Sequence, residues 1–101
     1  MIPKQIPARE DELAEFCRRW HIRRLSFFGS VLRDDFGPAS DVDVLVEFEQ
    51  GRTPGLEVYE LEQELSHLCG GRRIDMVNPK YINRWLRDEV LDTAELAYAQ
   101  G

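Results

Sequence analysis

The sequence has no long hydrophobic segment, and it contains few cysteine residues. No apolar run approaches the ~20 residues that a membrane-spanning helix needs, and the N-terminal segment MIPKQIPARE lacks the apolar core of a signal peptide. The two cysteines, Cys17 and Cys69, fall at apolar positions of expected helices, which favours buried free thiols over a disulfide or a metal pair. We therefore expect a cytoplasmic protein that does not bind membranes.

Positive charge is also scarce. The 101 residues include 13 Lys and Arg against 19 Asp and Glu, for a formal net charge of −6. Because phosphate backbones favour basic surfaces, this balance argues against nucleic acid as the main partner. The chain has no internal repeats, and its length predicts one domain over residues 1–101, with residues 1–7 as an extended lead-in.

Hydrophobic periodicity predicts that helices and strands alternate along the chain. The expected strands are Ile22–Phe28, Asp41–Phe48 and Arg72–Val77. The expected helices are residues 8–20, residues 54–69 with Thr53 as N-cap, and a third after Asn78-Pro79 whose inner face holds Ile82, Trp85, Leu86 and Val90. Residues 94–99 fit either a short edge strand, with Leu96 and Tyr98 facing inward, or a continuation of the third helix.

The stretch FFGSVLRDDFGPASDVDVLVEF, residues 27–48, combines a tight turn with paired acids. Gly29 lets the backbone approach a ligand closely, and Ser30 is expected to cap a helical turn over residues 31–35 whose free N–H groups face an anion. The Ser30 hydroxyl and the Arg33 guanidinium can add hydrogen bonds to the same anion. This half of the stretch predicts a phosphate-binding turn.

The other half supplies carboxylates. Asp41 and Asp43 are two residues apart on an expected strand, so they share the face opposite the apolar valines, with Cα atoms roughly 6.5–7 Å apart. Carboxylates together with substrate phosphates are the usual ligands of Mg²⁺. Asp75, on the strand Arg72–Val77, is the natural third acid if that strand pairs beside Asp41–Phe48.

Each feature has an ordinary meaning when it stands alone. A Gly-Ser pair is a common turn, two acids at a strand start are often solvated, and Asp75 can simply pair with Arg72 or Arg73. The combination at this spacing favours a functional site.

GSVLRDDFGPASDVDVLVEF resembles the Gly-Ser-x10-Asp-x-Asp signature of the DNA polymerase β-like nucleotidyltransferase superfamily, and RIDMVNP resembles the third-acid segment of its minimal nucleotidyltransferase branch. The likeness extends from Leu13 onward. It implies an α/β (α+β) palm with a small mixed sheet of three to four strands flanked by helices, and Mg²⁺-dependent transfer of a nucleoside monophosphate, usually AMP from ATP, to a hydroxyl. It also implies that Gly29, Ser30 and Arg33 bind the triphosphate, that Asp41, Asp43 and Asp75 bind the metal, and that Asp75 is the base for the acceptor hydroxyl.

Minimal nucleotidyltransferases of this length resemble antitoxins that pair with a HEPN-type toxin, a separately encoded ribonuclease, and add AMP to one of its tyrosines. The resemblance thus implies an enzyme, an antitoxin and a hetero-oligomer with a HEPN-type toxin. Two alternatives remain open: a non-catalytic antitoxin that inhibits its partner by stoichiometric occlusion, and transfer to a small molecule, for which the sequence supplies no acceptor pocket.

Overall fold

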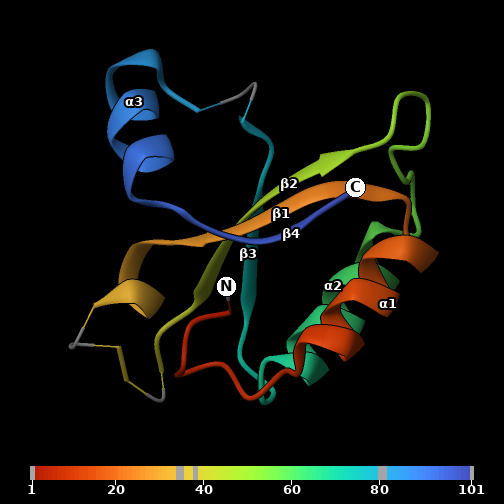
Figure 1. The fold of residues 1–101 in the computed structure, drawn as a ribbon, viewed down its shortest axis with the longest axis horizontal. Coiled ribbons are helices and arrows are strands. Elements are labelled where there is room, and N and C mark those ends of the chain that lie inside the picture. The colour runs from red at the N-terminus through yellow and green to blue at the C-terminus, as the bar shows by residue number, and fades with distance from the viewer. Residues whose placement is uncertain (1, 34–35, 38, 80–81, 101) are drawn as a thin grey trace.

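Helices and strands alternate along the chain in the computed structural model, which describes residues 2–33, 36–37, 39–79 and 82–100 (Figure 1). In chain order the elements are α1 (Glu10–Arg19), β1 (Ile22–Phe28), the 3-10 turn η1 (Gly29–Leu32), β2 (Val42–Phe48), α2 (Val58–Leu68), β3 (Ile74–Val77), α3 (Arg84–Thr93) and β4 (Glu95–Ala99).

The strands form a four-stranded mixed sheet in the order β3-β2-β1-β4. The central strand β1 is antiparallel to both β2 and β4, whereas β2 and β3 are parallel. A parallel pair cannot be joined by a tight turn, and here α2 makes the crossover between its two strands. This sheet with its helices is the expected mixed α/β fold.

Apolar residues of β2 pack with those of α1 and α2 in the hydrophobic core on one face of the sheet. Val42, Val44 and Val46 are buried, as the alternation of the strand predicts. The helices α1 and α2 lie side by side on one side of the molecule, and α3 lies on the other (Figure 1). From the helices come the buried residues Leu13, Phe16, Cys17, Leu61 and Leu65.

Both cysteines are buried free thiols, as expected. Burial raises the pKa of Cys17 and of Cys69 to about 12, so neither thiol is a ready nucleophile at neutral pH. None of the helices in the described part of the chain is long and apolar enough to cross a membrane.

Several helix starts differ from the sequence-based expectation. The first helix begins at Glu10 rather than at residue 8, and the third begins at Arg84 with Asn83 as its cap, so Ile82 precedes it. Helix α2 begins at Val58 after a turn, and Thr53 does not cap it; the residue before the helix is Glu57, whose carboxylate accepts a hydrogen bond from the Gly55 N–H. The expected helical turn over residues 31–35 is instead η1, which begins at Gly29 and is preceded by Phe28, so Ser30 lies inside it and is not its cap. Residues 34–35 lie outside the described residues.

The N-terminal lead-in is not simply extended. A backbone hydrogen bond from the Ile6 N–H to the Pro3 carbonyl closes a turn, and Ile6 is buried in the core. The Gln5 side chain donates to the Val31 carbonyl at 2.9 Å and to the Arg33 carbonyl at 3.2 Å. Pro3 and Pro7 indicated an open chain, but apolar burial of Ile6 and these bonds fold it against η1.

Residues 95–99 form an edge strand, which decides between the two alternatives for this segment. The inward orientation expected for both Leu96 and Tyr98 is wrong for Leu96, which is 40% exposed, whereas Tyr98 packs against the core. The register between β1 and β4 shifts between Leu25 and Ser26. A bulge of this kind breaks the alternation of faces, so the two side chains no longer share one face.

The expected inner face of α3 is wrong as well. Trp85 is 84% exposed and Leu86 is 54% exposed, while Ile82 and Val90 are only half-buried. The spacing of these residues is that of an amphipathic helix, but no other part of the described structure covers Trp85.

Candidate active site

The strand register brings the turn and the acids together. In the antiparallel pair Phe28 faces Asp43, so Gly29, which follows β1, lies beside the start of β2. In the parallel pair Asp43 faces Asp75. The three segments that the sequence analysis singled out therefore meet at one end of β2, with Asp43 between the other two.

Gly29 is in direct contact with Asp43. Its φ is +75°, and a Cβ at this position would lie 2.4 Å from Asp43 Oδ2. A side chain at this position is disfavoured by the backbone conformation, and its Cβ would have to displace the end of the Asp43 side chain. The Asp43 carboxylate thus lies where a Cβ of residue 29 would be.

The acids raise the pKa of Asp43 above its ordinary value. The largest cause is burial, followed by the negative charge of Asp75, a hydrogen bond between the two carboxyl groups, and the charge of Asp41. Arg33 acts in the opposite direction. A carboxyl group in these surroundings resists ionisation unless positive charge comes close.

Ser30 and the first turn of η1 are held near Asp41. The Ser30 hydroxyl donates a long hydrogen bond, 3.4 Å, to the Asp41 carbonyl oxygen, and the Arg33 N–H donates to the Ser30 carbonyl at 2.9 Å. The Arg33 side chain is exposed beside the acids. All six candidate residues thus lie in one region, which spans β2, β3 and η1.

Arg72 supports the loop that leads to Asp41. Its guanidinium donates to the Gly37 carbonyl and lies over the Phe36 ring, 4.1 Å from the ring centroid. No ion pair within the described residues joins Asp75 to Arg72 or Arg73. Pairing of Asp75 with a neighbouring arginine, its ordinary structural meaning, is therefore not the arrangement found.

The carboxylates suit a hard divalent cation, although they do not form a compact ligand group as they stand. The part of the chain that the structure describes contains no group of three His, Cys, Asp or Glu side chains that could hold a metal ion. Asp43 lies opposite Asp75 in the strand register, and burial together with the charges of Asp75 and Asp41 raises the pKa of Asp43. Oxygen ligands crowded in this way are the donor set that Mg²⁺ takes, and a cation would relieve their repulsion.

A cavity of about 610 Å³ opens beside the turn. One wall is formed by the end of β1 and by η1, including Gly29 and Arg33, and the other by α3, including Leu86 and Val90. The contribution of α3 was missed from the sequence; the signal was the apolar spacing of Leu86 and Val90, which was interpreted as core packing.

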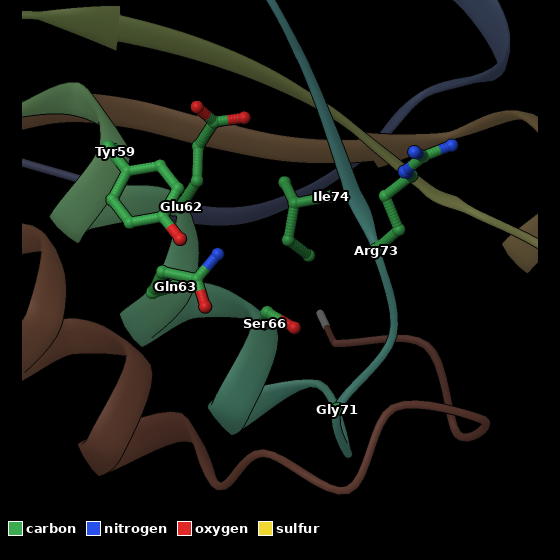
Figure 2. Close-up of a pocket in the computed structure, with 7 residues that line it drawn as sticks. All are labelled: Tyr59, Glu62, Gln63, Ser66, Gly71, Arg73 and Ile74. Atoms are coloured by element: carbon green, nitrogen blue, oxygen red, sulfur yellow. The ribbon is translucent and has the colours of Figure 1, made fainter.

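A second cavity, of about 350 Å³, lies between α2 and the segment that enters β3 (Figure 2). Its lining residues are Tyr59, Glu62, Gln63, Ser66, Gly71, Arg73 and Ile74. The Ser66 hydroxyl donates a hydrogen bond to the Arg72 carbonyl oxygen at 2.6 Å. The Arg73 side chain points away from α2 (Figure 2). The three aspartates line neither cavity, but Gly29 and Arg33 line the larger of the two and not this one, so the cavity beside α3 is the one that borders the candidate site.

Comparison with known proteins identifies the family. The model of the nucleotidyltransferase domain family matches residues 11–96. The chain is 36% identical over 87 residues to protein adenylyltransferase MntA of Thermococcus cleftensis, a match that covers 85% of this chain and 82% of that protein. It is 34% identical over 73 residues to a Methanocaldococcus jannaschii protein named as a protein adenylyltransferase, with 72% and 76% of the two chains covered.

Solved structures agree on the fold. A structure described as a minimal nucleotidyltransferase superposes with a TM-score of 0.68 at 36% identity and covers 84% of this chain and 85% of its own. A toxin–antitoxin structure with AMP-PNP has a TM-score of 0.68 at 18% identity, with 90% of this chain and 73% of that chain covered, and at this identity it shows the fold alone. The chain therefore belongs to the nucleotidyltransferase domain family and is a minimal nucleotidyltransferase.

Proposed function

We propose that this chain is a Mg²⁺-dependent protein adenylyltransferase that moves AMP from ATP to a tyrosine hydroxyl of a HEPN-type toxin, and so acts as the antitoxin of that toxin in the cytoplasm. The observation that carries the proposal is the position of Asp43, whose carboxylate lies against Gly29 and which faces Asp75 in the register of β2 and β3. The proposed metal ligands therefore lie beside the proposed phosphate-binding turn.

We assign the metal to Asp41, Asp43 and Asp75. When bound, Mg²⁺ would neutralise the negative charge of the triphosphate oxygens that develops during transfer. Asp75 is exposed at the edge of the sheet and has the further role of accepting the proton of the acceptor hydroxyl. The hydroxyl oxygen bonds to the α-phosphorus of ATP, the bond to the β-phosphate oxygen breaks, and pyrophosphate leaves.

We assign the triphosphate to Gly29, Ser30 and Arg33. The backbone N–H groups at the start of η1 and the Ser30 hydroxyl are hydrogen-bond donors for phosphate oxygens. The exposed Arg33 guanidinium adds positive charge where the acids would otherwise repel the nucleotide.

The names of similar proteins support the partner and the reaction. Two curated relatives are named protein adenylyltransferases, and structural neighbours are toxin–antitoxin complexes named MntA–HepT or contain AMP-PNP. A HEPN-type toxin, tyrosine as acceptor and Mg²⁺ follow from the family resemblance.

A second candidate is a non-catalytic antitoxin that inhibits by occlusion. The observation in its favour is that the acids of the described residues do not form a ready three-ligand group. On this alternative the acids bind nucleotide or nothing, and the partner is inhibited without modification.

Transfer of label from [α-³²P]ATP to a purified HEPN-type toxin distinguishes the two candidate functions. The wild-type chain with Mg²⁺ is expected to label the toxin, and Asp43→Asn is expected to lose transfer by at least about 10³-fold because a metal ligand is removed. Glu60→Gln, which changes an exposed acid on α2, is the control and should transfer like the wild type. Wild-type transfer by Asp43→Asn would contradict the assigned mechanism.

A further inference from the structure

Helix α3 leaves its apolar side chains uncovered. Trp85 is 84% exposed, Leu86 54% and Leu91 46%, and no residue of the helix is buried. Exposed apolar groups that gather on one element mark an interaction surface more often than single scattered ones do. The exposed apolar side chains of α3 therefore indicate that a surface outside this helix covers them.

Packing within the chain does not explain why α3 is helical. The helix has ten residues, fewer than the ~12–15 at which an isolated helix becomes marginally stable in water. Its start is capped by the Asn83 side chain, which accepts a hydrogen bond from the Trp85 N–H at 2.9 Å. Cavities border it on two sides: that of about 610 Å³ beside Gly29, and one of about 440 Å³ over Ser26 and Leu45 on the open face of the sheet.

The position of α3 relative to the active site decides what covers it. Leu86, Glu89 and Val90 form one wall of the cavity whose other wall includes Gly29 and Arg33. In the proposed reaction an acceptor hydroxyl has to reach the α-phosphate at that turn. A protein that inserts a tyrosine there must lie against α3.

The charges on α3 and next to it bear on the chemistry of that protein. Asp88 and Asp92 follow Trp85 at helical spacing, so they share its outward face. Glu89 of α3 and Glu95 of β4 line the cavity, and all four acids are exposed. The helix also carries Arg87 and Arg84, whose guanidinium lies 5.9 Å from the centroid of the Trp85 ring. A matching surface has an apolar pocket for the indole ring and Lys or Arg residues opposite Asp88 and Asp92.

A second copy of this chain is the less favoured occupant of this face. In a symmetric dimer the same patch meets itself, and Arg84 and Arg87 of one copy can pair with acids of the other, so the charges on α3 alone do not exclude a dimer. The net charge of −6 opposes association of two copies. The face also borders the proposed triphosphate-binding turn through the cavity that Gly29 and Arg33 line. The net charge and this position favour a basic acceptor protein as the occupant.

We propose that α3 is the docking helix for the acceptor protein, with Trp85 as the apolar anchor and Asp88 and Asp92 as contacts for basic side chains of that protein. This inference rests on the proposed function and names the surface that positions its protein substrate. Aromatic residues at the centre of an interface commonly carry much of the binding energy, and charges at its edge mainly steer association.

The test measures kcat and KM for the HEPN-type toxin with the wild type and the variants Trp85→Ala and Asp92→Lys. Trp85→Ala is expected to raise KM for the toxin by about tenfold or more. Asp92→Lys is expected to raise it less and to weaken its dependence on salt. Tyr59→Ala is the matched control, because Tyr59 is an aromatic residue 67% exposed on α2, away from the catalytic turn. It should leave KM unchanged.

Two partner-independent readouts separate docking from folding. Binding of AMP-PNP with Mg²⁺ and the thermal midpoint of the isolated chain should be the same in all variants, since these side chains are exposed. An unchanged KM in Trp85→Ala, in a chain that still modifies the toxin, overturns the docking inference and leaves the proposed function intact. A wild-type dimer that Trp85→Ala dissociates would make a second copy the occupant and would also overturn it. If the wild type neither binds nor modifies the toxin, the proposed function fails and the inference fails with it.

Discussion

The Asp43 carboxylate lies where a neutral side chain is more stable than a charged one. Burial and the neighbouring Asp75 and Asp41 raise its pKa in the folded chain. We therefore expect metal-free Asp43→Asn to be more stable than the metal-free wild type at pH 7, although it is inactive. The free energy of unfolding in urea measures the difference.

The pH dependence of that difference has a definite sign. Because the pKa of Asp43 is higher folded than unfolded, its ionisation destabilises the folded state. The stability associated with the protonated form is fully present below the unfolded pKa and is lost as pH rises through the raised, folded pKa. The wild type should approach Asp43→Asn in stability as pH falls toward 4. A gap that widens on acidification would contradict this account.

Gly29 and Gly51 form a matched pair for separating backbone strain from contact with the site. Both have a left-handed φ, +75° and +77°, but a Cβ on Gly29 meets Asp43 Oδ2 at 2.4 Å, whereas a Cβ on Gly51 meets nothing within 4 Å. Each change to Ala should lower the free energy of unfolding by about 1–2 kcal/mol.

Only Gly29→Ala should also lose AMP transfer, because its methyl group displaces the Asp43 carboxylate, the flexible end of a side chain, at little further cost in stability. Urea unfolding and a transfer assay on both variants test this. Equal transfer by the two variants would mean that the Gly29–Asp43 contact is irrelevant to the chemistry.

The sequence predicts Gly29, Asp41 and Asp43 as site residues, but it does not predict the contacts between them. The spacing of Gly29, Asp41 and Asp43 indicated a turn beside two acids on one strand face. That Asp43 fills the space beside Gly29 depends on the pairing of Phe28 with Asp43, a register that periodicity within one strand does not determine. Ser30 was expected as a helix cap because Ser is common there, but the turn begins at Gly29, two residues earlier than expected, with Phe28 in the cap position.

At the level of elements, the loop between η1 and β2 contacts Arg72, which lies in the segment that enters β3. Arg72 donates to the Gly37 carbonyl and stacks on Phe36, and the Gly37 N–H donates to the Ser40 hydroxyl at 3.1 Å. This connection fixes the end of the loop from which Asp41 starts.

Arg72→Ala should therefore reduce the free energy of unfolding by about 1–3 kcal/mol, the combined size of a charged hydrogen bond and a cation–π contact. It should also slow AMP transfer, since the loop before Asp41 loses its support. Arg73→Ala is the control: its side chain is exposed, and only its backbone carbonyl bonds to Val42. Comparable losses in both variants would show that the effect is general loss of charge.

The bounds of an element were predicted closely where the pattern of its apolar residues matches their burial in the core. The expected strand Ile22–Phe28 has the same bounds in the structure, because alternating burial of Leu25 and Phe27 marks it directly. The start of α2 was placed four residues early, since Thr53-Pro54 has the composition of a helix start but is followed by a turn. The bulge in β1–β4 pairing, which separates Leu96 from Tyr98, leaves no mark in the sequence.

At the scale of the whole molecule, the family and the fold could be predicted, and the exposed side of α3 could not. The apolar spacing of α3 indicates one buried face, and a single sequence does not say whether that face is covered by its own chain or by another. Trp85 was expected on the inner face of this helix, in the core or at a partner interface, and it is 84% exposed. Acids at a sheet end, beside an uncovered helix, support the proposal that a protein substrate completes the site.

The intact mass of the HEPN-type toxin, purified after incubation with this chain, shows whether the chain transfers AMP to that toxin. With ATP and Mg²⁺ we expect a mass increase equal to one or more AMP units located on a tyrosine, together with loss of toxin activity. We expect no increase with Asp43→Asn or without the metal. A toxin that is fully inhibited while its mass stays unchanged would rule out AMP transfer as the mode of inhibition and establish occlusion instead.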